Sequence, residues 1–379
     1  MEQKRLGDVA TYINGYAFKP EDRGSEGLPI IRIQDLTGNA YDVGFYNGNY
    51  PERIEIKNGD VLISWSASLG VYIWNRGRAL LNQHIFKVVF DKAEVNKQYF
   101  VYVVKYNLKE METKAHGATM KHIIKKDFDN TRIPFPSLEE QAKIANILSK
   151  VANIIETRKQ ELQKLDDLIK ARFVEMFGNP DINEKKWNEY KMEQLCEVGS
   201  SKRIYQNDQS LTGIPFLRIS DLVNRMDTGS KDCDLFIPEE LFGKLKKQGV
   251  VPVSGDILLT ARGTLGRCYI IQDEDEFYFQ DGMITWLSKY DERITPLYIS
   301  YLFEMPGFRK QIDSLQAGST VAYLSISMIK KLNVMTPPIE LQEQFSDFVK
   351  QVDKSKVEVQ KALDETQKLF DSLMQQYFG

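Results

Sequence analysis

The chain has few of the residues from which metal centres and covalent cross-links are built. Its 379 residues include only three cysteines and three histidines. The cysteines, Cys196, Cys233 and Cys268, lack the close spacing that zinc sites use, and no histidine stands with a carboxylate in a zinc-ligand pattern. We therefore expect isolated reduced thiols, no metal ion and no other cofactor.

Long apolar segments and an excess of one charge are also missing. No run of about 18 or more apolar residues occurs, as a membrane-spanning helix needs, and the first residues contain no apolar signal-peptide core. The 50 basic and 53 acidic residues nearly cancel, which neither requires nor excludes nucleic acid, because binding depends on local clusters of positive charge. We expect a cytoplasmic protein of several domains that makes no membrane contact.

The motifs of common nucleic-acid enzymes do not occur either. The chain has no G-x-x-x-x-G-K-[S/T] phosphate loop, and residues 179–182, Asn-Pro-Asp-Ile, lack the aromatic residue with which an amino-methyltransferase stacks a flipped base. Asp181 and Glu184 resemble part of a nuclease motif, but they are too close in sequence to lie on adjacent strands and share a metal ion. The sequence predicts no active site.

What the chain does contain is an internal repeat of about half its length. Four segments of the first half return in the same order in the second half, with offsets of 186, 196, 203 and 201 residues. The matched segments are 27–36 with 213–222, 59–64 with 255–260, 138–141 with 341–344, and 177–178 with 378–379. A constant order with a drifting offset is typical of two copies of one fold whose loops differ in length.

Each copy follows the same internal plan. Short apolar runs separated by Gly and Asn turns predict β-strands, and a helical stretch follows them at 98–106 and again at 296–303. A proline motif at 134–136 or 337–338 then interrupts the chain. Arg32 and Arg218 recur inside two of the apolar runs, and we expect them in strands with a structural role.

After each proline motif, apolar residues recur in alternating steps of three and four, which predicts a coiled-coil helix of about five heptads. A helix of nearly 40 residues, about 55–60 Å long, needs a partner. The obvious partner is its own repeat in an antiparallel pair, and the alternative is that each helix pairs in trans. The predicted seam is Ile144, Ile147, Val151, Ile154, Leu162, Leu165, Ile169 and Met176 with Arg158 between them, facing Leu341, Phe345, Phe348, Val352, Val359, Leu363, Phe370, Leu373 and Tyr377 with Lys356 and Thr366 as polar interruptions.

We therefore predict an α+β fold with an internal pseudo-twofold repeat: two β-rich domains of mixed α/β structure joined by two long antiparallel coiled-coil helices. The predicted divisions are a first domain at 1–136, a central helix at 137–178, a second domain at 179–336 and a C-terminal helix at 337–379. Antiparallel helices would place the domains at opposite ends of a rod. Such a two-headed object suits DNA, because two half-sites lie a defined number of base pairs apart.

The segments that open the long helices carry a family resemblance. Residues 133–144 read Ile-Pro-Phe-Pro-Ser-Leu-Glu-Glu-Gln-Ala-Lys-Ile, and residues 337–344 read Pro-Pro-Ile-Glu-Leu-Gln-Glu-Gln. With the doubled Gly-Asp-[Val/Ile]-Leu-[Ile/Leu] strand, the Phe-Gly at each helix end and the Gly-Ala-Thr and Gly-Ser-Thr turns at 117–119 and 318–320, essentially the whole chain resembles the specificity subunits of type I restriction-modification systems. The second copy departs from the first at Pro-Pro-Ile-Glu, so docking at the two copies need not be identical.

The resemblance implies two target recognition domains, similar to that of adenine methyltransferases, each reading one half of a bipartite, interrupted DNA target. The implied partners are double-stranded DNA, two modification (methyltransferase) subunits docked on the helices, and restriction subunits that complete an endonuclease. The helices would set the spacing of the half-sites. Two alternatives remain: a two-headed rod that bridges other proteins, which cross-linking of both heads to DNA would exclude, and a self-sufficient enzyme.

Candidate DNA contacts were sought among side chains that hold phosphates or read base edges. They lie after the Gly-Asp strand of each copy and in the basic stretch before the proline motif. For any one of them the alternative is a solvated charge or a strand-ending turn. The candidates are Ser64, Ser66, Ser68, Arg76, Arg78, Lys114, His116, Thr119, Lys121 and His122 in the first copy and Thr260, Arg262, Thr264, Arg267, Arg309, Ser319 and Thr320 in the second.

Overall fold

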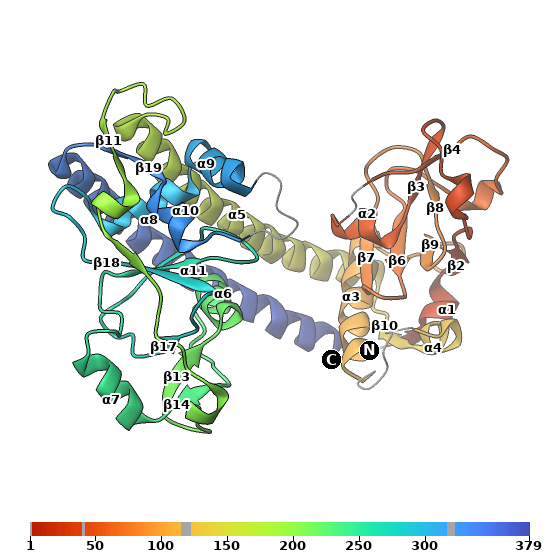
Figure 1. The fold of residues 1–379 in the computed structure, drawn as a ribbon. Coiled ribbons are helices and arrows are strands. Elements are labelled where there is room, and N and C mark those ends of the chain that lie inside the picture. The colour runs from red at the N-terminus through yellow and green to blue at the C-terminus, as the bar shows by residue number, and fades with distance from the viewer. Residues whose placement is uncertain (1, 40–41, 115–122, 317–322) are drawn as a thin grey trace. The chain divides into compact units, whose positions relative to one another are not determined.

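The computed structural model describes residues 2–39, 42–114, 123–316 and 323–379. The chain divides into two compact units, each with one copy of the repeat and part of both long helices (Figure 1). The first unit comprises Met1–Gln160 and Gln360–Gly379, and the second comprises Glu161–Val359. Among the described residues, no helix is long and apolar enough to cross a membrane.

The first unit is built on small sheets. The order β2-β9-β6-β7 forms an antiparallel sheet, β4-β3-β8-β5 forms a mixed one with β3 and β8 parallel, and β1 pairs with β10. The strands are β1 (Gln3–Arg5), β2 (Thr11–Asn14), β3 (Leu28–Ile31), β4 (Phe45–Tyr46), β5 (Glu55–Ile56), β6 (Val61–Ser64), β7 (Gly70–Ile73), β8 (Ala79–Leu81), β9 (Ile85–Val89) and β10 (Arg132–Pro134). The helices are α1 (Leu6–Val9), α2 (Ile33–Thr37), α3 (Lys97–Lys114) and α4 (Lys125–Asn130), with 3-10 turns at Pro20–Asp22 and Glu52–Ile54.

The second unit repeats this topology, except that its mixed sheet has three strands among the described residues where that of the first unit has four. Its sheets run β12-β18-β15-β16 and β14-β13-β17, again with one parallel pair, and β11 pairs with β19. The strands are β11 (Asn188–Lys191), β12 (Glu197–Gly199), β13 (Ile214–Leu217), β14 (Phe236–Ile237), β15 (Ile257–Thr260), β16 (Cys268–Ile270), β17 (Tyr278–Phe279), β18 (Ile284–Ser288) and β19 (Asn333–Thr336). The helices are α6 (Ile219–Thr228), α7 (Glu239–Lys247), α8 (Pro296–Glu304), α9 (Pro306–Gln316) and α10 (Ile326–Lys330), with 3-10 turns at Met192–Gln194 and Gln206–Asp208.

The prediction that Arg32 and Arg218 lie inside strands is wrong. Each arginine follows the end of a strand and is the residue that precedes a helix, α2 or α6. The Asp35 carboxylate accepts hydrogen bonds from the backbone amide and the Nε of Arg32 at 2.8 and 3.1 Å, and Asp221 does the same for Arg218 at 2.9 Å each. An acidic side chain three residues into the helix occupies amide groups that the helix itself leaves unpaired. The local capping bonds, not the apolar pattern, decide where the strand ends.

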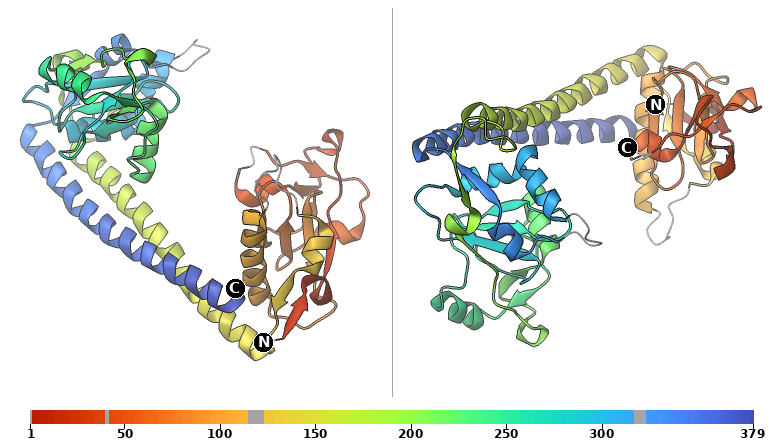
Figure 2. Two further views of the ribbon diagram at one scale, coloured as in Figure 1. Left: turned by 90° about the horizontal axis from the view of Figure 1, so that it is seen from below. Right: turned by 45° about the horizontal axis from the view of Figure 1, so that its top comes forward.

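The two long helices are α5 (Leu138–Phe177) and α11 (Ile339–Phe378), each of 40 residues. In the second unit they are antiparallel, because higher residue numbers in α5 meet lower ones in α11. Asp166 lies 2.6 Å from the Nζ of Lys356, and the ring of Phe173 lies 5.5 Å from that of Phe345. In the first unit, Arg158 reaches across to α11. Figure 2 shows the two helices side by side.

The polar seam positions find partners on the opposite helix. The Arg158 guanidinium donates hydrogen bonds to the carbonyl of Ala362 and the hydroxyl of Thr366, both within the first unit. In the second unit, Lys356 forms an ion pair with Asp166. A shifted register would leave these partly buried polar groups unpaired, so they favour a single alignment of the helices.

Part of the predicted seam is wrong. Ile147 and Ile154 are 40% and 45% exposed, and Leu148 and Ile155 are buried in their place. The seam was predicted for a helix with one partner, but α3 also packs on this part of α5, with the Tyr102 hydroxyl 3.1 Å from that of Ser149. Because α3 packs on α5 as well, the buried positions of α5 are one residue later in the sequence than predicted.

The first turn of each long helix contains a buried glutamine. The side-chain oxygen of Gln141 accepts a hydrogen bond from the Asn96 amide, and its nitrogen donates to the Pro136 carbonyl, both at 2.9 Å. Gln342 makes the same pair of bonds with the Thr295 amide and the Pro337 carbonyl, also at 2.9 Å. Both glutamines are fully buried. They clamp the segment that enters the long helix to the loop that enters α3 or α8.

The equivalence of Gln141 and Gln342 corrects the predicted repeat. The sequence match paired Gln141 with Gln344, at an offset of 203, whereas the helix bounds and the buried bonds give an offset of 201. The same offset of 201 relates the Phe-Gly pairs at the two helix ends. The similarity of Leu-Glu-Glu-Gln to Leu-Gln-Glu-Gln is therefore a coincidence of composition, two residues out of register.

Each long helix ends in the other copy of the repeat. Phe177, at the end of α5, packs on Tyr298 of α8 with ring centroids 4.9 Å apart, and Phe378, at the end of α11, packs on Tyr99 of α3 at 5.5 Å. The tyrosine hydroxyls donate to backbone carbonyls of β19 and β10 at 2.9 and 2.8 Å. The Phe-Gly motif thus completes the core of the opposite copy, in the same way at both helix ends.

We predict that Gln342→Ala lowers the free energy of unfolding by about 2–4 kcal/mol, because it leaves the partly buried Thr295 amide and the buried Pro337 carbonyl without their partner. Gln344→Ala, at an exposed position, is the matched control and should change it by less than about 0.5 kcal/mol. Urea unfolding and hydrogen exchange of the Thr295 amide measure both effects. Equal destabilisation by the two variants would contradict the corrected register.

Candidate nucleic-acid interface

The predicted contacts nearest the Gly-Asp strands lie in one tight turn per copy. Ser64 and Thr260 are fully buried, and their hydroxyls donate to the carbonyls of Ser68 and Thr264 at 2.6 and 2.5 Å. Ser66 is buried as well. These three side chains shape the turn and present no surface to a ligand, whereas Ser68 and Thr264 are exposed at its tip.

The two candidate arginines of the first copy hold neighbouring elements. Arg78 forms a bidentate ion pair with Glu55, at 2.7 and 2.9 Å. Arg76 donates to the Asp35 carbonyl at 3.0 Å, which ties the turn between β7 and β8 to α2. Both side chains are exposed apart from these contacts. A phosphate that contacted either arginine would compete with these bonds or add to them.

In the second copy, Arg267 and Arg309 are similarly engaged. Arg267 pairs with Asp227 at 2.6 Å, and Arg309 donates to the Leu265 carbonyl at 2.8 Å. Arg262 differs from them: its guanidinium lies 5.0 Å above the ring of Tyr323 and forms no ion pair within the described part of the chain. It is an exposed cation held by a ring and not by a carboxylate.

The remaining candidates lie at the end of a described range or outside the described residues. Lys114 is the last residue of α3. Six others lie outside the described residues: His116, Thr119, Lys121, His122, Ser319 and Thr320.

Around the tight turn, the two copies share their backbone but not their side chains. The amide of Trp65 donates to the carbonyl of His84 at 3.2 Å, and the amide of Ala261 donates to that of Met283 at 2.9 Å. These bonds make tryptophan equivalent to alanine and histidine equivalent to methionine. One position further on, a buried serine in the first copy corresponds to the exposed Arg262 in the second. The backbone hydrogen bonds around the turn are therefore the same in both copies, whereas the side chains at the turn differ.

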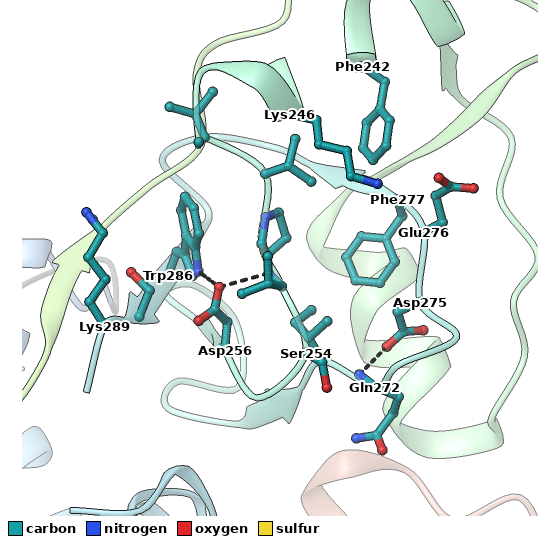
Figure 3. Close-up of a pocket in the computed structure, with 18 of the residues that line it drawn as sticks. Phe242, Lys246, Ser254, Asp256, Gln272, Asp275, Glu276, Phe277, Trp286 and Lys289 are labelled. Atoms are coloured by element: carbon teal, nitrogen blue, oxygen red, sulfur yellow. Dashed lines mark hydrogen bonds between the residues drawn. The ribbon is translucent and has the colours of Figure 1, made fainter. Parts of the chain in front are cut away.

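The second unit contains an acidic cavity of about 990 Å³ (Figure 3). Asp256 lies in its wall, where burial raises the pKa of the carboxyl group, and accepts hydrogen bonds from the Trp286 indole at 2.8 Å and the Val253 amide at 2.9 Å. Asp275 is paired with Arg225, but the wall keeps an excess of negative charge that repels a polyanion. Its charged residues are Glu197, Asp256, Asp273, Glu274, Asp275 and Glu276 against Lys246 and Lys289.

A second concavity in the same unit, of about 530 Å³, has the opposite charge. Three arginines line it, with Asp281 as the one carboxylate of the wall. Arg203 pairs with Asp281 at 2.9 Å, and Arg218 pairs with residues behind the wall, so Arg262 contributes the uncompensated charge. Gln209 and Gln280 also line it and add hydrogen-bonding groups. Positive charge with amide groups in a hollow is the chemistry that phosphates and base edges require.

Comparison with known proteins agrees with this chemistry. Residues 1–166 and 184–367 match the model of the type I restriction modification DNA specificity domain. The chain belongs to this family. It is a DNA sequence-specificity subunit of a type I restriction-modification system, and its part in that system is recognition and not catalysis.

Similar proteins cover almost the whole chain. It is 23% identical over 414 residues to the EcoBI specificity subunit of Escherichia coli, covering 98% of this chain and 84% of that one. It is 24% identical over 391 residues to the MjaVIII specificity subunit of Methanocaldococcus jannaschii, covering 95% and 89%. The fold is that of the type I S subunit from M. genitalium (TM-score 0.53, 16% identity, 100% and 96% covered) and of a chain in a structure of the type I R-M system (TM-score 0.58, 15%, 99% and 97%).

The sequence did not point to Arg203, Gln209 or Gln280. The candidates lie after the Gly-Asp strands and in the stretches before the proline motifs, and these three residues lie elsewhere in the sequence. The only local signal is that Gln280 directly follows the apolar run Phe277–Phe279, which becomes β17. That the three residues meet around one hollow is visible only in the folded chain.

We predict that Arg78→Gln lowers the melting temperature in a pH-dependent way. Arg78, helped by the Tyr50 hydroxyl, lowers the pKa of Glu55 to about 2. A lowered carboxyl pKa stabilises the fold above the ordinary value of about 4.3, and the stabilisation is lost as the pH falls toward 2. The difference from wild type should be full above about pH 5 and shrink below it. Arg53→Gln is the control, because Arg53 is exposed and its side chain forms no ion pair within the described residues. A difference independent of pH would contradict this explanation.

Proposed function

We propose that each copy of the repeat reads one half of a bipartite, interrupted DNA target, and that the long helices dock the modification subunits and set the spacing of the half-sites. The observation that carries this is the repeated backbone with different side chains, Trp65 and His84 in one copy and Ala261 and Met283 in the other. A shared framework allows both copies to approach DNA alike. Different side chains on it select different bases.

The proposal divides the chain into recognition domains at 1–136 and 179–336 and long helices at 137–178 and 337–379. Within the recognition domains, we propose as DNA contacts the candidates that are exposed or half-buried, together with Lys114 at the end of α3 and the candidates outside the described residues. The buried Ser64, Ser66 and Thr260 act indirectly, by shaping the turn. The acidic cavity of the second unit is left out because of its charge. The proposed contacts are Ser68, Arg76, Arg78, Lys114, His116, Thr119, Lys121, His122, Arg262, Thr264, Arg267, Arg309, Ser319 and Thr320.

Two modification subunits, restriction subunits and a cytoplasmic location are proposed as well. The relatives are named as subunits of restriction enzymes, and one similar structure concerns the assembly of the type I R-M system. On α5, Ile147 and Ile154 lie two helical turns apart on one face and are 40% and 45% exposed. Exposed apolar side chains in a row on a helix favour a protein partner there.

The partners are tested by recovering the tagged chain from its native cells and identifying co-purified proteins by mass spectrometry. We expect a DNA methyltransferase at about two copies per chain. Replacing Ile147 and Ile154 by glutamate should reduce the recovered methyltransferase, while glutamate at the exposed Lys159 serves as the control. Recovery with unrelated proteins and no methyltransferase would favour the bridging alternative instead.

Exchange of one recognition domain tests the division of labour. Replacing residues 1–135 with the corresponding domain of another specificity subunit should change one half of the methylated target and leave the other half as it was. Mapping of methylated adenines in cells that carry the complex measures this, with the unmodified chain as the control. A change in both halves would show that the copies do not read DNA independently.

A further inference from the structure

The second copy contains a basic concavity whose side chains are suited to reading its half of the DNA target. Resting on that proposed function, we infer that Gln209, Gln280 and Arg262 are the side chains of the second copy that contact base edges. All three line the basic concavity of about 530 Å³.

Their hydrogen-bonding groups are the ones that the protein itself leaves unused. The carboxamides of Gln209 and Gln280 are half-buried, yet they form no hydrogen bond with another side chain or with the backbone of the described chain. Arg262 stacks on Tyr323 without an ion pair there. The other two arginines of the wall are tied to Asp281, Asp221 and Asp234. Two of the lining arginines are therefore engaged in ion pairs, whereas the two glutamines and Arg262 have hydrogen-bonding groups available to a ligand.

The backbone holds these three residues in place before DNA arrives. The Gln280 amide donates to the Leu217 carbonyl at 2.9 Å, at the end of the parallel pair β13–β17. The Gln209 amide closes the 3-10 turn on Gln206 at 3.2 Å. Arg262 pairs by a backbone bridge with Tyr323, whose ring it also covers. Because the backbone is already fixed, binding has to order only the rotamers of these side chains and not the segments that carry them.

The chemistry of these groups predicts what they select. A carboxamide offers one donor and one acceptor side by side, which match N7 and N6 of adenine in the major groove. A guanidinium offers two parallel donors, which match O6 and N7 of guanine. We therefore expect the half-site of the second copy to contain A·T pairs read by the glutamines and a G·C pair read by Arg262.

The test uses the chain assembled with its modification subunits, and maps methylated sites in a library of random DNA. Gln209→Ala, Gln280→Ala and Arg262→Ala should each lower base discrimination about 5- to 100-fold at one position of the half-site that domain exchange assigns to the second copy. The half-site of the first copy should be unchanged, which shows that the complex is folded and assembled.

Two further variants separate reading from other effects. Arg203→Gln removes a charge from the same wall, where the arginine is ion-paired and 65% exposed, and should weaken binding at all sequences without changing the preferred one. Gln280→Glu keeps the shape of the side chain and removes its donor, so the preference should move from adenine toward cytosine, whose N4 amino group a carboxylate accepts. This shift is expected even if an alanine variant is too unstable to assemble.

The outcomes distinguish this inference from the function on which it rests. If the wild-type complex has no bipartite preference, the proposed function fails. If that preference exists and the three alanine variants and Gln280→Glu keep full discrimination at every position of the second half-site, the inference is wrong and the proposed function stands. Relaxed reading in the half-site of the first copy would also overturn it.

Discussion

The structure depends most on how the two long helices are fixed at their ends. Each has in its first turn a glutamine bonded to the backbone of its own copy, and each ends at a phenylalanine packed on a tyrosine of the other copy. Neither core is complete without a helix end from the opposite half of the sequence. Buried amide bonds at one end and ring contacts at the other demand both correct length and correct register, which the polar pairs of Arg158 and Lys356 reinforce.

The two copies stabilise equivalent groups of the shared fold with different residues. The carboxylate of the repeated Gly-Asp motif is an example: Asp60 lies 3.3 Å from the Lys87 ammonium, whereas Asp256 accepts a hydrogen bond from the Trp286 indole at 2.8 Å. Lys87 and Trp286 occupy equivalent places in the two sheets, opposite the second residue of β6 and β15. The fold tolerates such exchanges because backbone bonds define it. That tolerance allows the exposed positions to diverge as well.

The sequence predicted the repeat, the alternation of strands and helices and the two long helices, because each is written as a local pattern of apolar residues, prolines and glycines. It failed where a second neighbour decides the outcome. Because α3 packs on α5, the buried face of α5 includes Leu148 and Ile155, and Ile147 and Ile154 are left exposed. The helix match was two residues out of register because only the fold shows that the buried glutamine is Gln342.

The candidate site was predicted less well, for a related reason. Ser64 and Thr260 have side chains suited to DNA, but the carbonyls that their hydroxyls bind come within reach only when the turn forms. Repetition between the copies, which served to find the fold, selects residues that both copies need for structure. Side chains that give each copy its own target are by their nature not repeated, and the ones proposed above follow from the shape and charge of the hollow around Arg262.

The central claim is that one backbone, used twice, presents two different sets of base-reading side chains. Its most direct test is to assemble the complete complex and sequence the DNA that it binds from a random pool. The account predicts two half-sites of unrelated sequence at a fixed separation. A single uninterrupted target, or two identical half-sites, would contradict it.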